Sequence, residues 1–439
     1  PGSVVVGHAF LQPGPWGRFK NLPLRRDVVE GMIDQGLTVL RYGGSMVNAV
    51  EYRWKKMIGP RDRRPPYKGL WYPHSTNGWG IIDFLDLCEA AGFLPIPAFN
   101  MDESPRDMAD FVAYVNGPAE SEWGKKRVAD GLPASYRLKH IELGNEERVD
   151  EKYWERFRAI AEEIWKIDRE IVLVVGDFVY GQPIADPNNI KGTASGITNL
   201  AAHRKILELT KRHGREVWFD IHIGTEHPGA LSELAVVPTF VEALDKISAG
   251  AKHKVVIFEL NSGNHAQRRA LANAIAIGSL QHLGDKLPVI CSANGLQPDG
   301  QNDNGWDQGL LFLNPSQVWM QPPGYVCRMI SRSYRPISVE ARVEGEGEKL
   351  KVSAARSEDG KTLVLRVVNV GDKPIAADLA FAGFTPAKPT ASVEELAGAM
   401  DERNSAKEPR RIVPKVREWR HESRAYTFPA GSFTVMSLE

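Results

Sequence analysis

The sequence predicts an α/β chain in which a (β/α)8 TIM barrel is followed by a C-terminal antiparallel β-sandwich. Up to about residue 334, apolar strand-like runs alternate with amphipathic helical runs, which is the pattern of a closed α/β barrel. From residue 337 onward, short runs of alternating polarity lie between turn signals, as the strands of a sandwich do. We therefore expect a barrel over residues 1–334 and a β-sandwich over residues 335–439.

The barrel strands are expected to be continuously apolar, because strands covered on both faces carry Val, Ile and Leu on each side. Such runs are Val4–Val6, Leu37–Arg41, Phe93–Phe99, Leu138–Leu143, Ile171–Val175, Val217–Ile223, Val255–Leu260 and Leu287–Cys291. Helical patterns between them are Arg26–Met32, Ile81–Ala91, Pro105–Val115, Lys152–Ile167, Leu200–Arg212, Pro238–Ile247 and Ala266–Leu283. An open doubly wound sheet is the alternative, but no Gly-rich dinucleotide turn follows the first run.

The sandwich strands follow from shorter alternating runs. These are Ser338–Val343, Leu350–Ala354, Thr362–Asn369, Ala376–Phe381, Ala425–Phe428 and Phe433–Leu438. Residues 384–424 are rich in proline and charge. We expect this segment to be a long excursion between two strands.

Composition excludes several classes of protein. The 439 residues contain 55 Lys plus Arg and 55 Asp plus Glu, and this balance argues against nucleic-acid binding and against a basic membrane surface. No apolar run approaches the roughly 18 residues of a transmembrane helix. Cys88, Cys291 and Cys327 have neither metal-ligand nor disulfide spacing, so we expect buried thiols. The start at Pro1, without Met, is typical of a trimmed chain, which leaves the cellular location open although secretion is favoured.

Two carboxylates are expected at one end of the barrel. The fourth predicted strand runs into Gly144-Asn145-Glu146, and the seventh carries Glu259 near its end. Strand C-termini in such barrels share the face that holds the active site. Two carboxyl groups roughly 5–5.5 Å apart could protonate a leaving oxygen and attack an anomeric carbon. The alternative is that Glu146 begins a solvated helix, while Glu142, on the same strand, is interpreted as structural.

A series of short motifs supports this chemistry. They are Leu40–Gly44, Ile58–Pro65, Trp71, Thr76-Asn77, Gly80, Asp83–Leu85 and Cys88, followed by Gly144-Asn145-Glu146 and Phe258-Glu259. In order and spacing they resemble the motifs of glycoside hydrolase family 51, the α-L-arabinofuranosidases of a Glu/Glu barrel clan. The C-terminal sandwich fits the same architecture.

The resemblance implies roles for individual residues. Glu146 would be the general acid/base and Glu259 the nucleophile, while Asn145 would donate to the sugar hydroxyl beside the anomeric carbon. Arg41 would pair with the nucleophile and keep it ionised. His222 matches a family histidine and could orient a carboxylate, bind a sugar hydroxyl or be structural. We expect no metal there, because no second ligand lies at suitable spacing, and no cofactor, because two carboxylates suffice.

The residues around the substrate depart from the family pattern. Ser45 stands where the family usually has Asn, Ile223–Glu226 replaces aromatic residues, and Gly78-Trp79 replaces Glu-Phe. The catalytic pair is thus kept, and the substrate pocket altered. Further candidates for binding substrate, by stacking or hydrogen bonding, are Trp79, Trp306, Asn100 and Asn294. The polar stretch 302–307 is expected at the rim and resembles a calcium loop only faintly.

These observations predict a retaining glycoside hydrolase acting on a plant cell-wall polysaccharide or oligosaccharide. By resemblance, an α-L-arabinofuranosidase releasing arabinose from hemicellulose is favoured. An endo-β-1,4-glucanase or xylanase is the alternative, and a catalytically inactive carbohydrate-binding barrel is the hypothesis from another class. The resemblance also implies that the chain could form a homo-oligomer.

Overall fold

The computed structural model describes residues 2–6, 9, 11–71, 74–301, 306–345 and 349–439. By internal packing the chain divides into two compact units. The first comprises Pro1–Arg26, Thr38–His222 and Ala235–Phe258; the second comprises Asp27–Leu37, Ile223–Leu234 and Glu259–Glu439. The proposed boundary between residues 334 and 335 stays a prediction.

The predicted barrel fold is confirmed. Seven strands lie side by side in chain order in one sheet, and the pairs from β1 to β5 are parallel. Their bounds are β1 Val39–Tyr42, β2 Leu94–Phe99, β3 His140–Leu143, β4 Val172–Gly176, β5 Glu216–Gly224, β6 Lys252–Asn261 and β7 Ile290–Ser292. Each strand begins within a few residues of its predicted run. The runs are continuously apolar, as strands covered on both faces require.

The prediction of a first strand at Val4–Val6 is wrong. These three valines are not part of a strand, and they are 73% to 93% exposed. A run of three apolar residues contributes too little buried surface to hold an extended segment in a sheet.

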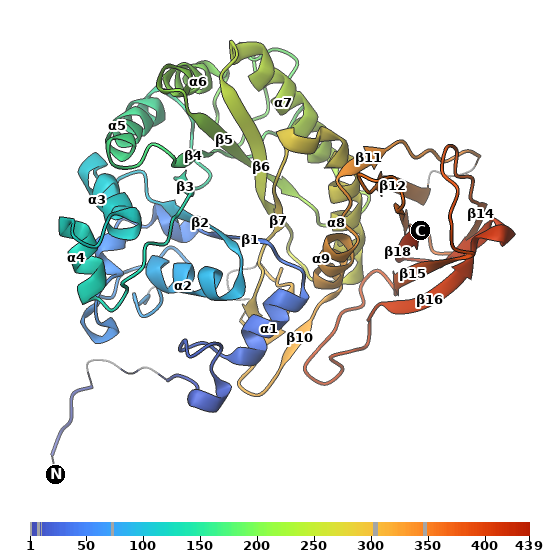
Figure 1. The fold of residues 1–439 in the computed structure, drawn as a ribbon, viewed down its shortest axis with the longest axis horizontal. Coiled ribbons are helices and arrows are strands. Elements are labelled where there is room, and N and C mark those ends of the chain that lie inside the picture. Colours follow the sequence, from blue (N-terminus) through green and yellow to red (C-terminus); the bar gives the residue numbers. More distant parts are fainter. Residues whose placement is uncertain (1, 7–8, 10, 72–73, 302–305, 346–348) are drawn as a thin grey trace. The chain divides into compact units, whose positions relative to one another are not determined.

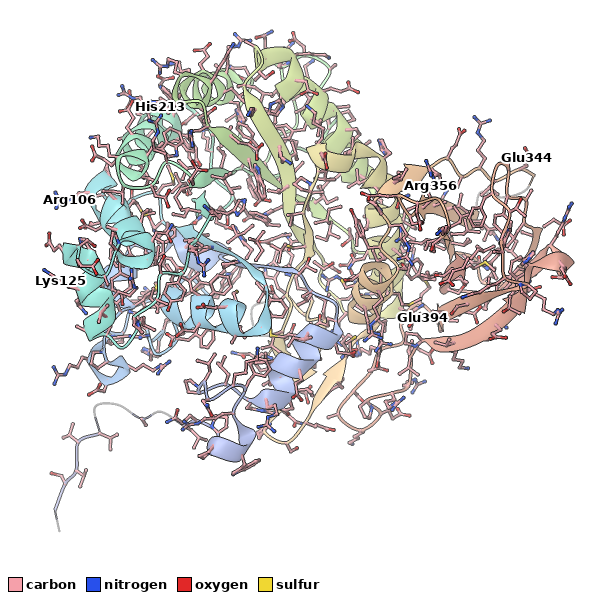
Figure 2. All side chains as sticks on the ribbon, viewed as in Figure 1. Arg106, Lys125, His213, Glu344, Arg356 and Glu394 are labelled. Atoms are coloured by element: carbon pink, nitrogen blue, oxygen red, sulfur yellow. The ribbon has the colours of Figure 1, made fainter. Side chains whose placement is uncertain are left out.

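Helices of the first unit cover the outer side of its strands (Figure 1). They are α2 Ile81–Ala91, α3 Pro105–Asn116, α4 Glu122–Ala129, α5 Glu151–Ile167, α6 Ala201–His213 and α7 Val236–Ile247. Ser104 caps α3 by accepting a hydrogen bond from the backbone N–H of Asp107, and Gly92 ends α2 with φ 81°. Figure 2 shows Arg106 and Lys125 on the outward faces of α3 and α4. Helix α4 was not predicted, because Gly124 and two lysines interrupt its apolar stripe.

The second unit contains the antiparallel sheets predicted for the C-terminal part. Its helices are α1 Arg26–Asp34, whose first residue belongs to the first unit, α8 Gln267–Leu280 and α9 Pro322–Arg332. A small sheet joins β8 Gln297–Pro298, β9 Leu311–Leu313 and β10 Val318–Met320. Six strands form the main sheet in the order β11-β12-β13-β18-β15-β16, and β14 pairs with β17. These strands are β11 Ile337–Val339, β12 Leu350–Arg356, β13 Leu363–Asn369, β14 Ile375–Asp378, β15 Thr390–Ala397, β16 Lys415–Arg420, β17 Ala425–Phe428 and β18 Ser432–Leu438.

The expectation of a strandless excursion over residues 384–424 is wrong. It contains β15, which pairs along one side with β18 and along the other with β16. Ala391, Val393 and Leu396 of β15 are fully buried. The adjacent charged pair Glu394-Glu395 breaks the apolar alternation that would have revealed the strand.

Helices α8 and α9 are held to the main sheet by polar contacts within the second unit. Gln281, just after α8, donates to the carbonyl of Ala354 at 2.8 Å. Arg366 of β13 donates to the carbonyl of Ser333, which follows α9, at 2.9 Å. No helix among the described residues combines the length and apolar character needed to cross a membrane.

Candidate active site

The chain turns sharply where β3 ends, and this turn aims Glu146. Gly144 has φ 86° and Glu146 has φ 53°, so both adopt the left-handed conformation that only glycine adopts freely. A Cβ on Gly144 would lie 2.3 Å from Cγ of Glu147. The turn is fixed by the backbone N–H of Glu147, which donates to the carbonyl of Gly176 at 2.8 Å. Backbone strain of this kind clusters at functional sites.

Arg41, at the end of β1, reaches across to two side chains from β3 and its turn. Its guanidinium donates to both carboxylate oxygens of Glu142, at 2.6 and 2.8 Å, and to Oδ1 of Asn145 at 2.7 Å. Burial raises the pKa of Glu142 to about 7, and Arg41 opposes that rise. Since Arg41 occupies the amide oxygen of Asn145, the amide nitrogen is the group that Asn145 can offer as a donor. Pairing of Arg41 with the predicted nucleophile stays a prediction.

Two carboxylates flank the imidazole of His222 on β5. Its Nδ1 lies 3.0 Å from Oε1 of Glu146, and its Nε2 lies 2.9 Å from Oδ2 of Asp220. His222 and Asp220 are fully buried, whereas the side chain of Glu146 is 28% exposed. The backbone N–H of Phe258 on β6 donates to the other oxygen of Asp220 at 2.8 Å. Of the roles expected for His222, the geometry supports orientation of a carboxylate.

Glu259 follows Phe258 on the unbroken strand β6. Its Oε2 accepts a hydrogen bond from Nδ2 of Asn261 at 3.0 Å. Sequence spacing does not reveal Glu146 as a neighbour of His222, because 76 residues separate two side chains that lie 3.0 Å apart. The expectation of no metal at His222 stays a prediction.

The remaining candidates differ in what the structure shows of them. Asn100 is buried, and its amide donates to the carbonyls of Val47 and Ala49 at 2.6 and 2.9 Å. It thereby holds the segment in which Asn48 donates to the backbone carbonyl of Asn145 at 2.9 Å. This is a structural role, and contact of Asn100 with substrate stays a prediction.

The aromatic and rim candidates lie at the surface. Trp79 is 36% and Trp306 is 40% exposed, and Asn294, two residues after β7, is exposed. Stacking on the tryptophans and binding by Asn294 stay predictions. Of the polar stretch 302–307, residues 302–305 lie outside the described residues, and the carboxylate of Asp307 accepts a hydrogen bond from Gln297 at 2.9 Å.

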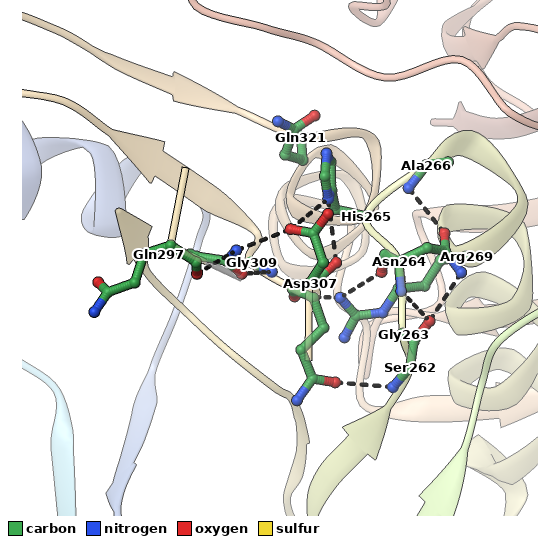
Figure 3. Close-up of polar contacts among 12 residues, drawn as sticks. Ser262, Gly263, Asn264, His265, Ala266, Arg269, Gln297, Asp307, Gly309 and Gln321 are labelled. Atoms are coloured by element: carbon green, nitrogen blue, oxygen red, sulfur yellow. Dashed lines mark hydrogen bonds and ion pairs between the residues drawn. The ribbon is translucent and has the colours of Figure 1, made fainter. Parts of the chain in front are cut away.

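A buried arginine contacts the loop that follows β6 (Figure 3). Arg269, at the start of α8, donates to the backbone carbonyls of Leu260 at 3.1 Å and of Asn264 at 3.3 Å. It also donates to the carbonyls of Ala293 and Gln308. Burial lowers the pKa of Arg269 to about 10. Through these four carbonyls the guanidinium of Arg269 connects the ends of β6 and β7 with the segments that follow the two strands.

Three contributors to the site were absent from the sequence-based candidates: Asp220, Asn48 and Asn261. Asp220 could have been found, because a residue two positions before His222 on a strand shares its face. Asn261 has the same relation to Glu259. Asn48 lies in an irregular segment, for which no periodicity places a side chain.

The chain is similar in sequence to known arabinofuranosidases. Residues 32–184 match the family model described as alpha-L-arabinofuranosidase 1 domain. Alpha-L-arabinofuranosidase 2 of Arabidopsis thaliana is 23% identical over 97% of this chain and 62% of its own length. An extracellular exo-alpha-L-arabinofuranosidase of Streptomyces chartreusis is 31% identical over 36% of this chain and 23% of its own length. The resemblance to glycoside hydrolase family 51 is confirmed.

Solved structures extend the likeness to the whole fold. The alpha-L-arabinofuranosidase of Thermotoga maritima superposes with a TM-score of 0.77 at 19% identity, covering 99% of this chain and 94% of that one. A family 51 alpha-L-arabinofuranosidase of Bifidobacterium longum gives 0.78 at 18% identity, covering 99% and 93%. The chain spans less than two thirds of the length of the Arabidopsis and Streptomyces relatives.

Proposed function

We propose that the chain is a retaining glycoside hydrolase that removes terminal α-L-arabinofuranose from hemicellulose. One observation carries the proposal: the turn after β3 holds the carboxyl group of Glu146 at 3.0 Å from the imidazole of the buried His222, where the barrel strands end. Glu259 is the second carboxyl group in the proposal; retaining glycosidases hold the two roughly 5–5.5 Å apart, whereas inverting enzymes need roughly 6.5–9.5 Å for a water molecule. The names of the similar proteins support arabinofuranose as the sugar.

In the first step the carboxylate of Glu259 attacks the anomeric carbon. The glycosidic C–O bond breaks, and Glu146 gives its proton to the leaving oxygen, so that a glycosyl ester with Glu259 remains. The N–H of Asn261 that points at Glu259 fixes one carboxylate oxygen and thereby helps to aim the other at the sugar.

In the second step a water molecule attacks the anomeric carbon of that ester. Glu146, now ionised, takes the proton of the water, and the bond between the sugar and Glu259 breaks. Both carboxyl groups return to their initial states, and the sugar leaves with its original anomeric configuration.

In the proposal Asn145 binds the substrate beside the two catalytic glutamates, and Arg41 positions Asn145. The amide N–H of Asn145 would bind the hydroxyl beside the anomeric carbon, a hydrogen bond that strengthens in the transition state. Arg41 holds that amide in place by donating to its oxygen, and the Arg41–Glu142 pair fixes the guanidinium itself.

The positions that depart from the family pattern determine whether the substrate site is a pocket for one terminal sugar or an open cleft. Among them, Glu226 is already engaged, because its carboxylate accepts hydrogen bonds from Ser262, Gly263 and Asn264. It therefore supports the loop after β6 and is not free to replace an aromatic wall. Ser45, Gly78-Trp79 and Ile223–Thr225 remain the positions at which the pocket can differ from that of an arabinofuranosidase.

The testing experiment is a product profile on arabinoxylan and on a soluble β-1,4-glucan, with wild type and Glu259→Ala in parallel. Release of arabinose alone by wild type supports exo-acting arabinofuranosidase activity. Oligosaccharides from the glucan with a rapid fall in viscosity would favour the endo-acting alternative. Binding without hydrolysis in both proteins would overturn the enzymatic proposal in favour of a carbohydrate-binding barrel.

A further inference from the structure

We propose that Asp220 and His222 are positioning residues that keep the catalytic proton at Glu146. The inference rests on the acid/base role proposed for Glu146, and it adds how that proton is held between turnovers. It depends on a continuous line of contacts from Phe258 of β6 through Asp220 and His222 to Glu146. All four residues belong to the first compact unit.

The line of contacts fixes the hydrogen on one side of the imidazole. Both ring nitrogens of His222 face carboxylate oxygens, at 2.9 and 3.0 Å; a flipped ring would turn carbon atoms toward them. The carboxylate of Asp220 already accepts the N–H of Phe258, and an ionised carboxylate can only accept. Nε2 of His222 therefore carries a hydrogen and donates it to Asp220.

The other side of the ring must then share one further proton with Glu146. With Nε2 protonated, a neutral imidazole offers only a lone pair at Nδ1. A hydrogen bond to Oε1 of Glu146 at 3.0 Å consequently needs a proton, either on the carboxyl group or on Nδ1 as an imidazolium. In both arrangements the Glu146–His222 pair holds one exchangeable proton, which is the proton that acid catalysis requires.

The surrounding charges favour retention of that proton. Within the first unit, the charged groups around the Glu146–His222 bond come from three strands: Arg41 of β1, Glu142 of β3 and Asp220 of β5. Arg41 and Glu142 form an ion pair with each other. The carboxylate of Asp220 lies 2.9 Å from Nε2, and a negative charge beside the shared proton stabilises it. Asp220 has no direct contact with the reacting atoms in this scheme.

The proton follows a balanced path through the reaction. In the first step it passes from Glu146 to the leaving oxygen as the glycosidic bond breaks. In the second step the attacking water returns a proton to Glu146, and the bond to His222 is restored. Asp220 keeps its charge throughout, and its role is to hold the ring with Nδ1 aimed at Oε1.

The test is the pH dependence of kcat/KM for Asp220→Asn on two substrates. One is a natural arabino-oligosaccharide with a poor leaving group, and the other is a 4-nitrophenyl arabinofuranoside, which needs little acid help. Removing the negative charge of Asp220 makes the proton shared by Glu146 and His222 easier to lose, whichever way the new amide is oriented. We expect the alkaline limb on the natural substrate to move about one pH unit lower, a loss of about tenfold on that limb, and a loss below about threefold on the aryl substrate.

A buried pair elsewhere in the barrel supplies the matched control. His203 and Asp177 are fully buried, and Nε2 of His203 lies 2.6 Å from Oδ2 of Asp177. Asp177→Asn removes the same charge from the same kind of pair, so it should lower thermal stability without moving the pH profile. His222→Gln serves as the second variant should Asp220→Asn fold poorly, and the same downward shift is expected of it.

The outcomes separate this inference from the proposed function. A wild-type enzyme that hydrolyses neither substrate would remove the proposed function itself. An active wild type whose alkaline limb is unchanged in both Asp220→Asn and His222→Gln would overturn the inference alone. Equal losses on the two substrates at every pH would also overturn it, because they would mark a purely structural role.

Discussion

Oε1 of Glu146 lies 3.0 Å from Nδ1 of His222, although 76 residues separate the two in the chain. The contact exists because parallel barrel strands end at one face, so that the turn after β3 and the end of β5 face each other across it. A positive φ at Glu146 completes the approach. This single contact joins the acid/base candidate to a buried histidine and, through it, to Asp220.

The acid/base role of Glu146 predicts losses that depend on the leaving group. Glu146→Ala should slow natural linkages by about 10²–10⁴-fold, the usual contribution of general acid catalysis, and slow activated aryl glycosides much less in the step that forms the ester. Single-turnover kinetics on both substrates would measure this. Glu147→Gln is the matched control, since it alters the adjacent carboxyl group and should leave both rates within about threefold. Equal losses for Glu146→Ala on both substrates would remove the assignment.

The buried pair of Arg41 and Glu142 predicts a stability coupling. Removing one partner leaves the other charge buried and unpaired, so Glu142→Leu or Arg41→Met should each destabilise the fold by about 3–5 kcal/mol. The double variant should lose much less than the sum, because no unpaired charge remains. Urea unfolding of the four proteins measures this. Additive losses would show that the pair is not energetically coupled.

Buried Glu103 predicts that stability depends on pH in a defined direction. Burial raises the pKa of Glu103 from 4.5 to about 7, and the backbone N–H of Trp54 donates to it at 2.9 Å. Between pH 4.5 and 7 the folded chain therefore holds more of this proton than the unfolded chain, and the contribution of Glu103 to stability falls as pH rises. Glu103→Gln, which keeps an oxygen for Trp54, should raise Tm relative to wild type at pH 8 but not at pH 5.

The half-buried carboxylate of Asp107 provides the comparison for Glu103. Its pKa is lowered, despite partial burial, by hydrogen bonds from Lys55 and Ser104. Asp107→Asn should therefore lower Tm slightly at pH 8, where the pairing is present, and have little effect once the group is protonated at low pH. A Tm difference for Glu103→Gln that is the same at pH 5 and pH 8 would contradict the raised pKa.

The nucleophile role of Glu259 predicts loss of turnover on every substrate. Without its carboxylate no glycosyl ester can form, so Glu259→Ala should reduce kcat by several orders of magnitude on aryl and natural substrates alike. Mass spectrometry of wild type with a slow 2-fluoro arabinofuranoside should show a covalent adduct on the peptide that contains Glu259. An adduct on another residue, or full activity of Glu259→Ala, would refute the assignment.

The barrel and seven of its strands could be predicted because each strand produces a periodic signal in the sequence, and Glu146 and Glu259 stay predictions from short motifs. The partners of the candidate residues were not predicted. The ion pair of Arg41 with Glu142 was not predicted, because the partner of a buried arginine depends on strand register and rotamers. Strand β15 was missed because adjacent charges hide its alternation. Asp220 was missed because its importance comes from the histidine two positions later on the same face.

The most direct test of the central claim follows the anomeric configuration of the first product. Proton NMR during hydrolysis of 4-nitrophenyl α-L-arabinofuranoside would record whether the α or the β anomer of arabinose appears before mutarotation. Double displacement through Glu146 and Glu259 predicts α-arabinose first. Initial release of the β anomer would mean a single displacement by water and would contradict the account.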